Sequence, residues 1–323
     1  MAISVDGKGV VLRREDLREA TRQRAEASEH KLQKRLSKGE KRHARRMATV
    51  AAVYTIAPQV RRPQEVIRVL APQPQREQGN RPRPQHKRLW ASLEKRPEEV
   101  IEQALGEAHS RDPTGSKSWV VLVDGHRSQL KTLLRCLRRS GRAAPTIVLD
   151  FIHVSEYVWK AGMALHGEVN PKLEGWVGEH LLSLLCGRSG YVAGGIRRSA
   201  TRRGLAGNAR KAVDRCANYL LKNAGYLHYD TYLAKGFPIA TGVIEGACRY
   251  LVKDRMEVTG ARWSLAGAEA VLRLRALRAS GDFDAYWRFH ERQESLRNHA
   301  ARYADGEVVP VRGPKRPHLK RVK

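Results

Sequence analysis

The sequence predicts an α/β protein, and three observations lead to this fold class. Two short β-branched runs, 119–123 and 146–149, each end directly on an aspartate. An Arg-rich segment with helical spacing, 128–140, separates them, and an opening run over 2–5 also ends on an acid. Strand, helix and strand with acids at the strand ends is typical of an open α/β sheet, whose ligands gather at the carboxyl ends of the strands.

The formal net charge of +28 over 323 residues indicates a polyanionic partner. Such a charge repels itself in the compact state, and a polyphosphate backbone compensates it because each neutralised phosphate releases counterions. Arginine dominates lysine in the basic runs, which favours phosphate recognition through a planar fork of donors. A merely solvated basic surface is the alternative.

The four cysteines are Cys136, Cys186, Cys216 and Cys248, and they form neither a CxxC pair nor a metal-ligand spacing. We expect them to be reduced and buried in helices. No apolar run approaches the roughly 20 residues that span a membrane, and no signal peptide is present. The sequence therefore predicts a cytoplasmic protein without a membrane partner.

Strand and helix patterns alternate in the first part of the chain. Residues 3–12 predict a strand that turns at Gly7–Lys8–Gly9 and returns, and residues 47–56 predict another strand. The highly charged stretch 14–46 between them is compatible with helix.

A Pro-, Gln- and Arg-rich stretch, 71–88, predicts a long surface loop or linker. The next segment, 97–109, predicts a helix with Pro97 near its first turn, acids following it and one apolar face.

After Asp150 the apolar period becomes helical. Three segments before residue 237 share this spacing, with no convincing strand among them: 153–166, 171–186 and 208–225. Three later helices are predicted at 240–258, 264–280 and 282–300. The basic tail, 301–323, is expected to be disordered.

Four acids stand out in these patterns: Asp6, Asp124, Asp150 and Glu245. Carboxylates from separate elements can bind two Mg²⁺ ions that activate a water or a 3′-hydroxyl in phosphodiester displacement. Mg²⁺ prefers hard oxygen ligands and keeps several waters, so a few acids suffice. Acids after strands are also frequent helix N-caps, which is the structural alternative for Asp124 and Asp150.

Several motifs, in order over nearly the whole chain, resemble the ISKra-type transposases of bacterial insertion sequences. They are DGKGV (6–10), SKGEKR (37–42) leading on to RMATVAAVY (46–54), LWASLE (89–94), VDG (123–125), LDFIHVSEYVW (149–159), GVIEGACR (242–249) and GARWS (260–264). The resemblance implies a ribonuclease-H-like mixed sheet core, a large all-helical insertion before the final glutamate, and a helical C-terminal part.

Four regions follow from the resemblance and the helical pattern together. They are the first part of the catalytic core, 1–150, the helical insertion, 151–236, the closing helices of the core, 237–300, and the basic tail, 301–323.

By the pattern of this family and its Mutator-like relatives, the DDE triad falls on Asp6, Asp124 and Glu245, which would also be the metal ligands. Asp150 and His153 then match the accessory (C/D)xxH element of those relatives. The alternative triad is Asp124, Asp150 and Glu245, with Asp6 structural. The first assignment is preferred because Asp6 begins the β-structure that precedes Asp124.

Four more residues are candidates for DNA contact. We expect Arg249, Arg255 and Arg262 to contact phosphates or to pair with the catalytic acids. Trp263 either stacks on a base near the cleavage point or belongs to the core. His153 either positions a ligand or is structural.

The resemblance thus implies a transposase that cleaves DNA and transfers the strand with Mg²⁺, for which Mn²⁺ can substitute. Its partners would be double-stranded DNA, at element ends and target, and further copies of itself, in a nucleoid-associated location. Family members usually carry a region before the core that is expected to recognise terminal repeats, whereas this chain begins at the core. The alternatives are a structure-specific nuclease on the same core and a non-catalytic or decayed transposase-derived DNA-binding protein.

Overall fold

The computed structural model describes residues 1–27, 44–70, 82–141, 144–258 and 260–300. Contacts divide the chain into two units, Met1–Ser280 and Gly281–Lys323, which we describe separately. The boundary lies within the stretch 237–300 that the sequence assigned to closing helices. The predicted tail, 301–323, lies outside the described residues.

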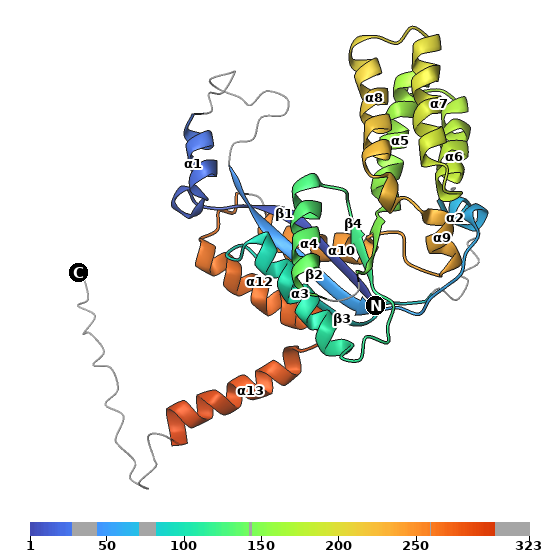
Figure 1. Ribbon diagram of the computed structural model, residues 1–323. Coiled ribbons are helices and arrows are strands. Elements are labelled where there is room, and N and C mark those ends of the chain that lie inside the picture. The colour runs from blue at the N-terminus through green and yellow to red at the C-terminus, as the bar shows by residue number, and fades with distance from the viewer. Residues whose placement is uncertain (28–43, 71–81, 142–143, 259, 301–323) are drawn as a thin grey trace. The chain divides into compact units, whose positions relative to one another are not determined.

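The first unit is built on a five-stranded mixed sheet (Figure 1). The strands lie in the order β3–β2–β1–β4–β5. The three strands β1, β2 and β3 pair antiparallel, whereas β4 and β5 run parallel to β1. Their bounds are β1 Ala2–Val11, β2 Arg45–Thr55, β3 Gln85–Ser92, β4 Val120–Val123 and β5 Thr146–Leu149.

The first strand is unbroken, so the predicted turn at Gly7–Lys8–Gly9 is wrong. β1 pairs with β2 residue by residue, from Ala2 opposite Tyr54 to Val11 opposite Arg45. A Cβ at Gly7 would lie 3.1 Å from the Met47 side chain, and one at Gly9 would lie 3.0 Å from that of Arg45. The two glycines therefore make room for large neighbours across the ladder instead of reversing the chain.

The predicted loop over 71–88 is wrong from Gln85 onward, where β3 begins. Residues 85–88 are exposed, while Leu89 and Ala91 are buried. Because β3 is an edge strand, only its second half needs apolar side chains, and the charged first half looks like a loop in the sequence. Residues 71–81 lie outside the described part.

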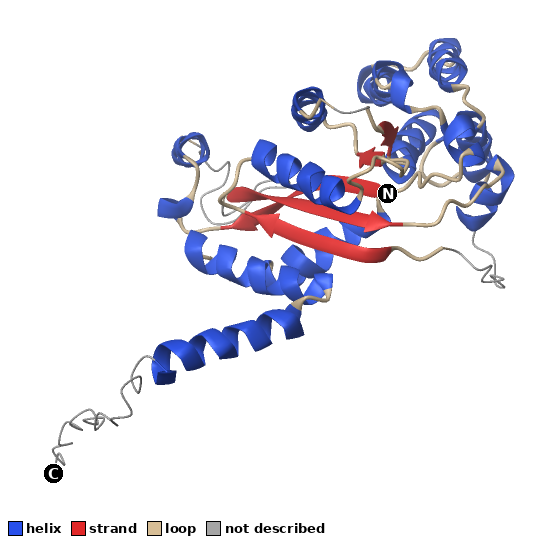
Figure 2. Ribbon diagram, turned by 60° about the horizontal axis from the view of Figure 1, so that its bottom comes forward, coloured by secondary structure: helices blue, strands red, loops and turns tan. Residues whose placement is uncertain are grey.

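Helices cover both faces of the sheet (Figure 2). Side chains of β1 alternate between the faces, since Ile3 and Val5 join one core cluster and Ala2 and Val10 join the other. The first cluster includes apolar residues of the helices α3 Pro97–Arg111, α4 Arg127–Arg139 and α5 Phe151–His166. The second includes those of α10 Gly242–Ala247 and α12 Leu265–Ser280.

Residues 151–236 are fully described, contain no strand and form the three helices that the sequence predicted, together with two that it missed. The helices are α5, α6 Lys172–Leu185, α7 Ser189–Arg202, α8 Gly207–Lys222, the 3-10 turn η2 Ala224–Tyr226 and α9 Tyr229–Ala234. The missed helices are the short α9 and the longer α7. The glycines and serines of α7 obscure its apolar spacing. Its buried residues nevertheless recur at Val192, Ala193, Ile196 and Ala200.

The predicted helix 240–258 is present in three connected pieces. α10 passes directly into the π-helix η3 Cys248–Lys253, which continues as α11 Asp254–Met256. π-turns within helices often mark functional positions. Here the π-turn begins three residues after Glu245.

The remaining elements are short helices of the first part and the helix of the second unit. They are η1 Arg14–Asp16, α1 Glu19–Glu26, α2 Pro63–Leu70, and, in the second unit, α13 Phe283–Ser295 followed by the π-helix η4 Leu296–Ala300. No helix in the described residues is long and apolar enough to cross a membrane. All four cysteines are free; Cys136, Cys216 and Cys248 are buried, and Cys186 is half-buried.

Candidate active site at the carboxyl end of the sheet

Asp6 and Asp124 lie on neighbouring parallel strands. The β1–β4 ladder pairs Ser4 with Leu122, and each strand reaches its aspartate two residues later. The side-chain amide of Gln129, in α4, donates to the Val5 carbonyl and so joins the end of this ladder to the helix that follows Asp124. The sheet thus brings together the first two predicted acids.

The carboxylate of Asp6 is held by two donors. The backbone N–H of Gly7 donates to Oδ1 over 2.6 Å, and the thiol of Cys248 donates to Oδ2 over 3.3 Å. Burial, followed by the charge of Asp6, raises the pKa of Cys248, which keeps the thiol protonated as a donor. Nothing in the sequence indicated a role for Cys248, because the contact joins the first strand to a helix near the other end of the chain.

Asp124 is positioned by a turn and by a tyrosine of the helical insertion. Its Oδ1 accepts from the backbone N–H of His126 over 2.8 Å, and its carbonyl accepts from the Tyr219 hydroxyl over 2.7 Å. Gly125 follows with a φ of 81°. The N-cap residue of α4 is His126, so Asp124 does not cap that helix. Its carboxylate is therefore not committed to a helix N-terminus.

Glu245 belongs to α10 and is exposed. The Thr241 hydroxyl donates to its Oε1 over 3.3 Å. Desolvation, together with the carboxylates of Asp150 and Asp6, raises the pKa of Glu245. Glu245 therefore lies within electrostatic reach of Asp6.

Asp150 is buried and acts as the N-cap of α5. Its Oδ1 accepts from the N–H groups of Ile152 and Thr241, and its Oδ2 accepts from that of His153. Burial raises the pKa of Asp150, and these hydrogen bonds oppose the rise. This carboxylate ties the start of the insertion to the segment before α10, as its N-cap alternative implied.

A cleft of about 1280 Å³ opens beside Asp124, between α4 and α8. His153 lines it, with its ring centroid 5.6 Å from that of Tyr157 and 6.1 Å from that of Tyr219. Asp6 and Glu245 are not among its lining residues. The cleft therefore reaches the acids from the Asp124 side.

The residues expected to contact DNA near Glu245 lie apart from this cleft. Arg249 is exposed, 3.7 Å from Asp254, and Arg262 is exposed. The guanidinium of Arg255 lies over the Trp263 ring, 4.8 Å from its centroid.

Trp263 is half-buried and pairs with the end of β1. It forms a bridge with Leu12, donates its N–H to the Val11 carbonyl and accepts at its own carbonyl from Arg13. Its ring packs against the second core cluster. Trp263 thus packs beside the core while part of the residue stays accessible.

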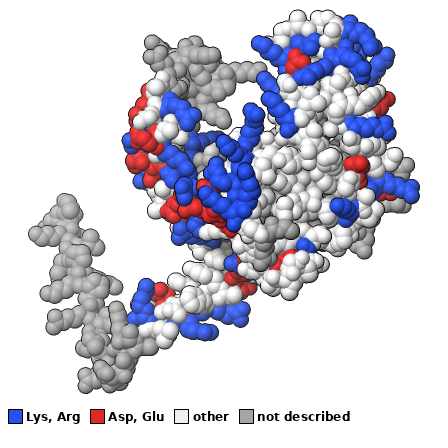
Figure 3. Space-filling view, in the orientation of Figure 1, with Lys and Arg blue, Asp and Glu red and all other residues white. Residues whose placement is uncertain are grey.

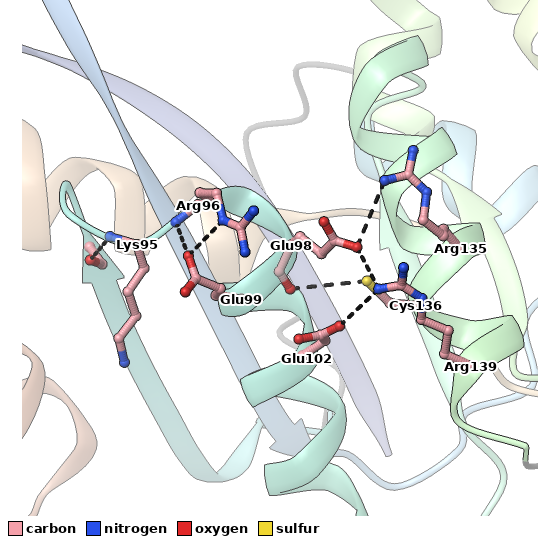
Figure 4. A network of polar contacts seen from close by, with 9 residues as sticks. Lys95, Arg96, Glu98, Glu99, Glu102, Arg135, Cys136 and Arg139 are labelled. Atoms are coloured by element: carbon pink, nitrogen blue, oxygen red, sulfur yellow. Dashed lines mark hydrogen bonds and ion pairs between the residues drawn. The ribbon is translucent and has the colours of Figure 1, made fainter. Parts of the chain in front are cut away.

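In the described residues, a different cluster has its potential metal-ligand atoms within 4.8 Å of one another. It consists of Glu98, Glu102 and Cys136. Figure 4 shows that arginines of α4 occupy it. Arg139 lies 2.8 Å from Glu98 and 3.7 Å from Glu102, and Arg135 lies 3.7 Å from Glu98. The cluster is therefore an ion-pair network that joins α3 to α4, and we do not assign it as a metal site.

Comparison of the chain with protein-family models, curated proteins and solved structures finds no match.

Proposed function

We propose that this chain is the catalytic core of a DDE transposase that cleaves DNA and transfers the strand. The observations that carry the proposal are the neighbouring positions of Asp6 and Asp124 on two parallel strands and the contact of Asp6 with Cys248, three residues after Glu245, whose carboxylate feels the charge of Asp6. The strand order 3-2-1-4-5, with three antiparallel and two parallel members, resembles a ribonuclease-H-like core. The helical insertion before Glu245 agrees with that resemblance.

The donor set at this end of the sheet fits Mg²⁺. All three groups are carboxylates, and desolvation and repulsion from Asp150 and Asp6 raise the pKa of Glu245; a cation would relieve the repulsion. In the described residues the carboxylate oxygens of these three acids do not all lie within 4.8 Å of one another. Two metal ions about 3.5–4 Å apart can be held by ligands that are spread more widely than those of a single ion. We assign Asp6, Asp124 and Glu245 as the ligands. When bound, Mg²⁺ or Mn²⁺ would activate the attacking oxygen and stabilise the leaving one.

The neighbouring residues orient these acids. Cys248 and Gly7 fix the rotamer of Asp6, and Thr241 holds Glu245. Asp150, which is buried and accepts from three N–H donors, supports the segment that leads to Glu245 and is not assigned to the triad. His153 lines the cleft beside Asp124, and we propose that it takes the accessory role there.

The partner we propose is double-stranded DNA, at element ends and at the target, bound largely through phosphates by a homo-oligomer in the nucleoid. The test is incubation of the full chain with supercoiled plasmid in Mn²⁺ or Mg²⁺ and in EDTA. We expect nicking that requires the metal. Tight binding of the plasmid without nicking in either metal would contradict the enzyme and favour a DNA-binding protein.

Joined products separate a transposase from a structure-specific nuclease on the same core. A labelled oligonucleotide with a free 3′-hydroxyl, incubated with unlabelled plasmid, reports strand transfer as label on the plasmid. Nicking without any joined label would leave the nuclease as the better description.

A further inference from the structure

Two rows of side chains face each other across the cleft beside Asp124. On α4 and on α8 the lining residues repeat with the same spacing of four, three and four positions, which places each row on one helical face. The rows are Arg127, Lys131, Leu134 and Arg138 on α4, and Lys211, Arg215, Asn218 and Lys222 on α8. Six of these eight side chains are cationic.

The six cations of these rows are exposed, and none forms an ion pair with an acid in the described residues. The adjoining face of α4 differs, because Arg135 and Arg139 pair there with acids of α3 (Figure 4). Figure 3 shows Lys and Arg gathered over α4 and on the facing edge of the insertion. α4 thus uses one set of arginines for its own packing and leaves the other set for an anion.

The acids in the cleft wall do not neutralise these rows. Asp214 is already paired with Arg210 at 2.9 Å and with Arg197 at 3.5 Å. The other lining acid is Asp124, at the end of the cleft. A bound polyanion would therefore meet unpaired positive charge along both walls and the candidate active site at one end.

Aromatic rings line the end of the cleft near Asp124. Tyr157 and Tyr219 stack in parallel, with centroids 4.0 Å apart, and His153 meets both rings edge-on. All three line the cleft. A cationic groove that ends in aromatic rings is the combination by which proteins hold unpaired nucleic acid, because bases out of the duplex can contact the rings.

We infer that the cleft between α4 and α8 is a track for a single DNA strand, whose backbone lies between the two cationic rows and leads to Asp124. The phosphates of a single strand between the two cationic rows can be neutralised from both sides at once. The bases of a duplex stay stacked and paired, so they cannot contact the aromatic rings. The reason for a strand to be there rests on the proposed function, in which one strand must leave the duplex near the cut. Its binding does not depend on catalysis.

The test measures binding of a fluorescent oligo-dT and of a hairpin duplex with the same number of nucleotides, by anisotropy in EDTA, where no metal supports cleavage. The test variant carries Lys131→Glu and Lys222→Glu, one on each wall. The control carries Arg198→Glu and Arg202→Glu, two exposed arginines of α7 that do not line the cleft. Both variants change the net charge by the same amount, so a difference in affinity between them cannot come from net charge alone.

We expect the cleft variant to lose at least about tenfold in oligo-dT affinity and the control to lose less than about threefold. The slope of log affinity against log salt should fall for the cleft variant, by about 0.7 for each lost phosphate contact to a single strand. The neutral pair Lys131→Gln with Lys222→Gln should show the same ranking, and thermal melts identify any variant that fails to fold.

Equal losses in the cleft variant and the control, or a loss confined to the duplex, would overturn the inference. This outcome is distinct from failure of the proposed function. Loss of oligo-dT binding confined to the cleft variants, in a wild-type protein that does not nick in either metal, would keep the strand track and remove the transposase. The reverse pattern would keep the transposase and remove the track.

Discussion

The thiol of Cys248 donates a hydrogen bond to the carboxylate of Asp6 across 242 positions of the chain. The bond joins β1, the central strand of the sheet, to the π-helix that follows Glu245. One contact therefore couples the first predicted acid to the helix that directly continues α10, the helix that carries the last. Its geometry depends on how η3 packs on the sheet.

Cys248→Ala is expected to reduce metal-dependent nicking about tenfold, because loss of one hydrogen bond worth roughly 1.4 kcal/mol frees the rotamer of Asp6. Cys248→Ser keeps a donor of similar size and should restore most of the rate. The measurement compares nicking rates of the variants, each corrected for the folded fraction that urea titration gives. Equal rates for the alanine and serine variants would show that the thiol serves packing only.

Asp150→Ala should lower the free energy of unfolding by about 2–3 kcal/mol, because it removes a helix cap and leaves the buried Thr241 without its acceptor. Urea denaturation measures the change. Glu156→Ala, in the same helix, removes only an exposed pair with Lys160 and should cost less than about 0.5 kcal/mol. Similar costs for the two variants would contradict the structural role of Asp150.

Glu245→Gln should raise the thermal stability of the metal-free protein at neutral pH. Since desolvation and the carboxylates of Asp150 and Asp6 raise its folded-state pKa, the ionised form of Glu245 weakens the fold above that pKa. The penalty fades as the pH falls through the raised pKa towards about 4.3, the ordinary value of a glutamate. The advantage of the variant should therefore shrink on acidification.

Melting curves from about pH 4.5 to 8, in EDTA and in Mg²⁺, check the sign. Mg²⁺ should stabilise the wild type more than the variant. An advantage that grows on acidification, or the same response to Mg²⁺, would remove Glu245 from the ligand set.

Gly125→Ala should destabilise the turn that presents Asp124. A Cβ there would lie 2.8 Å from Leu149 Cδ1 and 2.9 Å from the Tyr219 hydroxyl, and the φ of 81° adds strain of about 1–3 kcal/mol. The matched control is Gly190→Ala in α7, where a Cβ meets nothing within 4 Å and alanine should be neutral or stabilising. Comparable melting temperatures for the two variants would contradict the packing described for Gly125.

The sequence predicted the elements whose pattern is local and strong. β2, β4, β5, α3 and most helices of the insertion match periodicity that a single segment carries. The first half of the edge strand β3 was missed because it is exposed and carries Gln, His, Lys and Arg. The continuity of β1 was missed because its glycines look like a turn, whereas they make room for side chains of β2.

The candidate site divides in the same way. Asp124 follows a local strand pattern and Asp6 lies within one, so the sequence could place both on the sheet. Cys248, Tyr219 and Thr241 act through contacts across the chain, which no local pattern encodes. The facing rows on α4 and α8 could have been found as cationic helical faces, but their opposition across one cleft is a property of the fold.

The most direct test of the central claim is Mn²⁺-dependent nicking of supercoiled plasmid by the wild type beside Asp6→Asn, Asp124→Asn and Asp150→Asn. We expect the Asp6 and Asp124 variants to be inactive and Asp150→Asn to keep activity. The Asp124 variant should bind DNA as well as or better than the wild type. An inactive Asp150 variant beside an active Asp6 variant would contradict the triad. A wild type that binds DNA and never nicks it would contradict the enzyme.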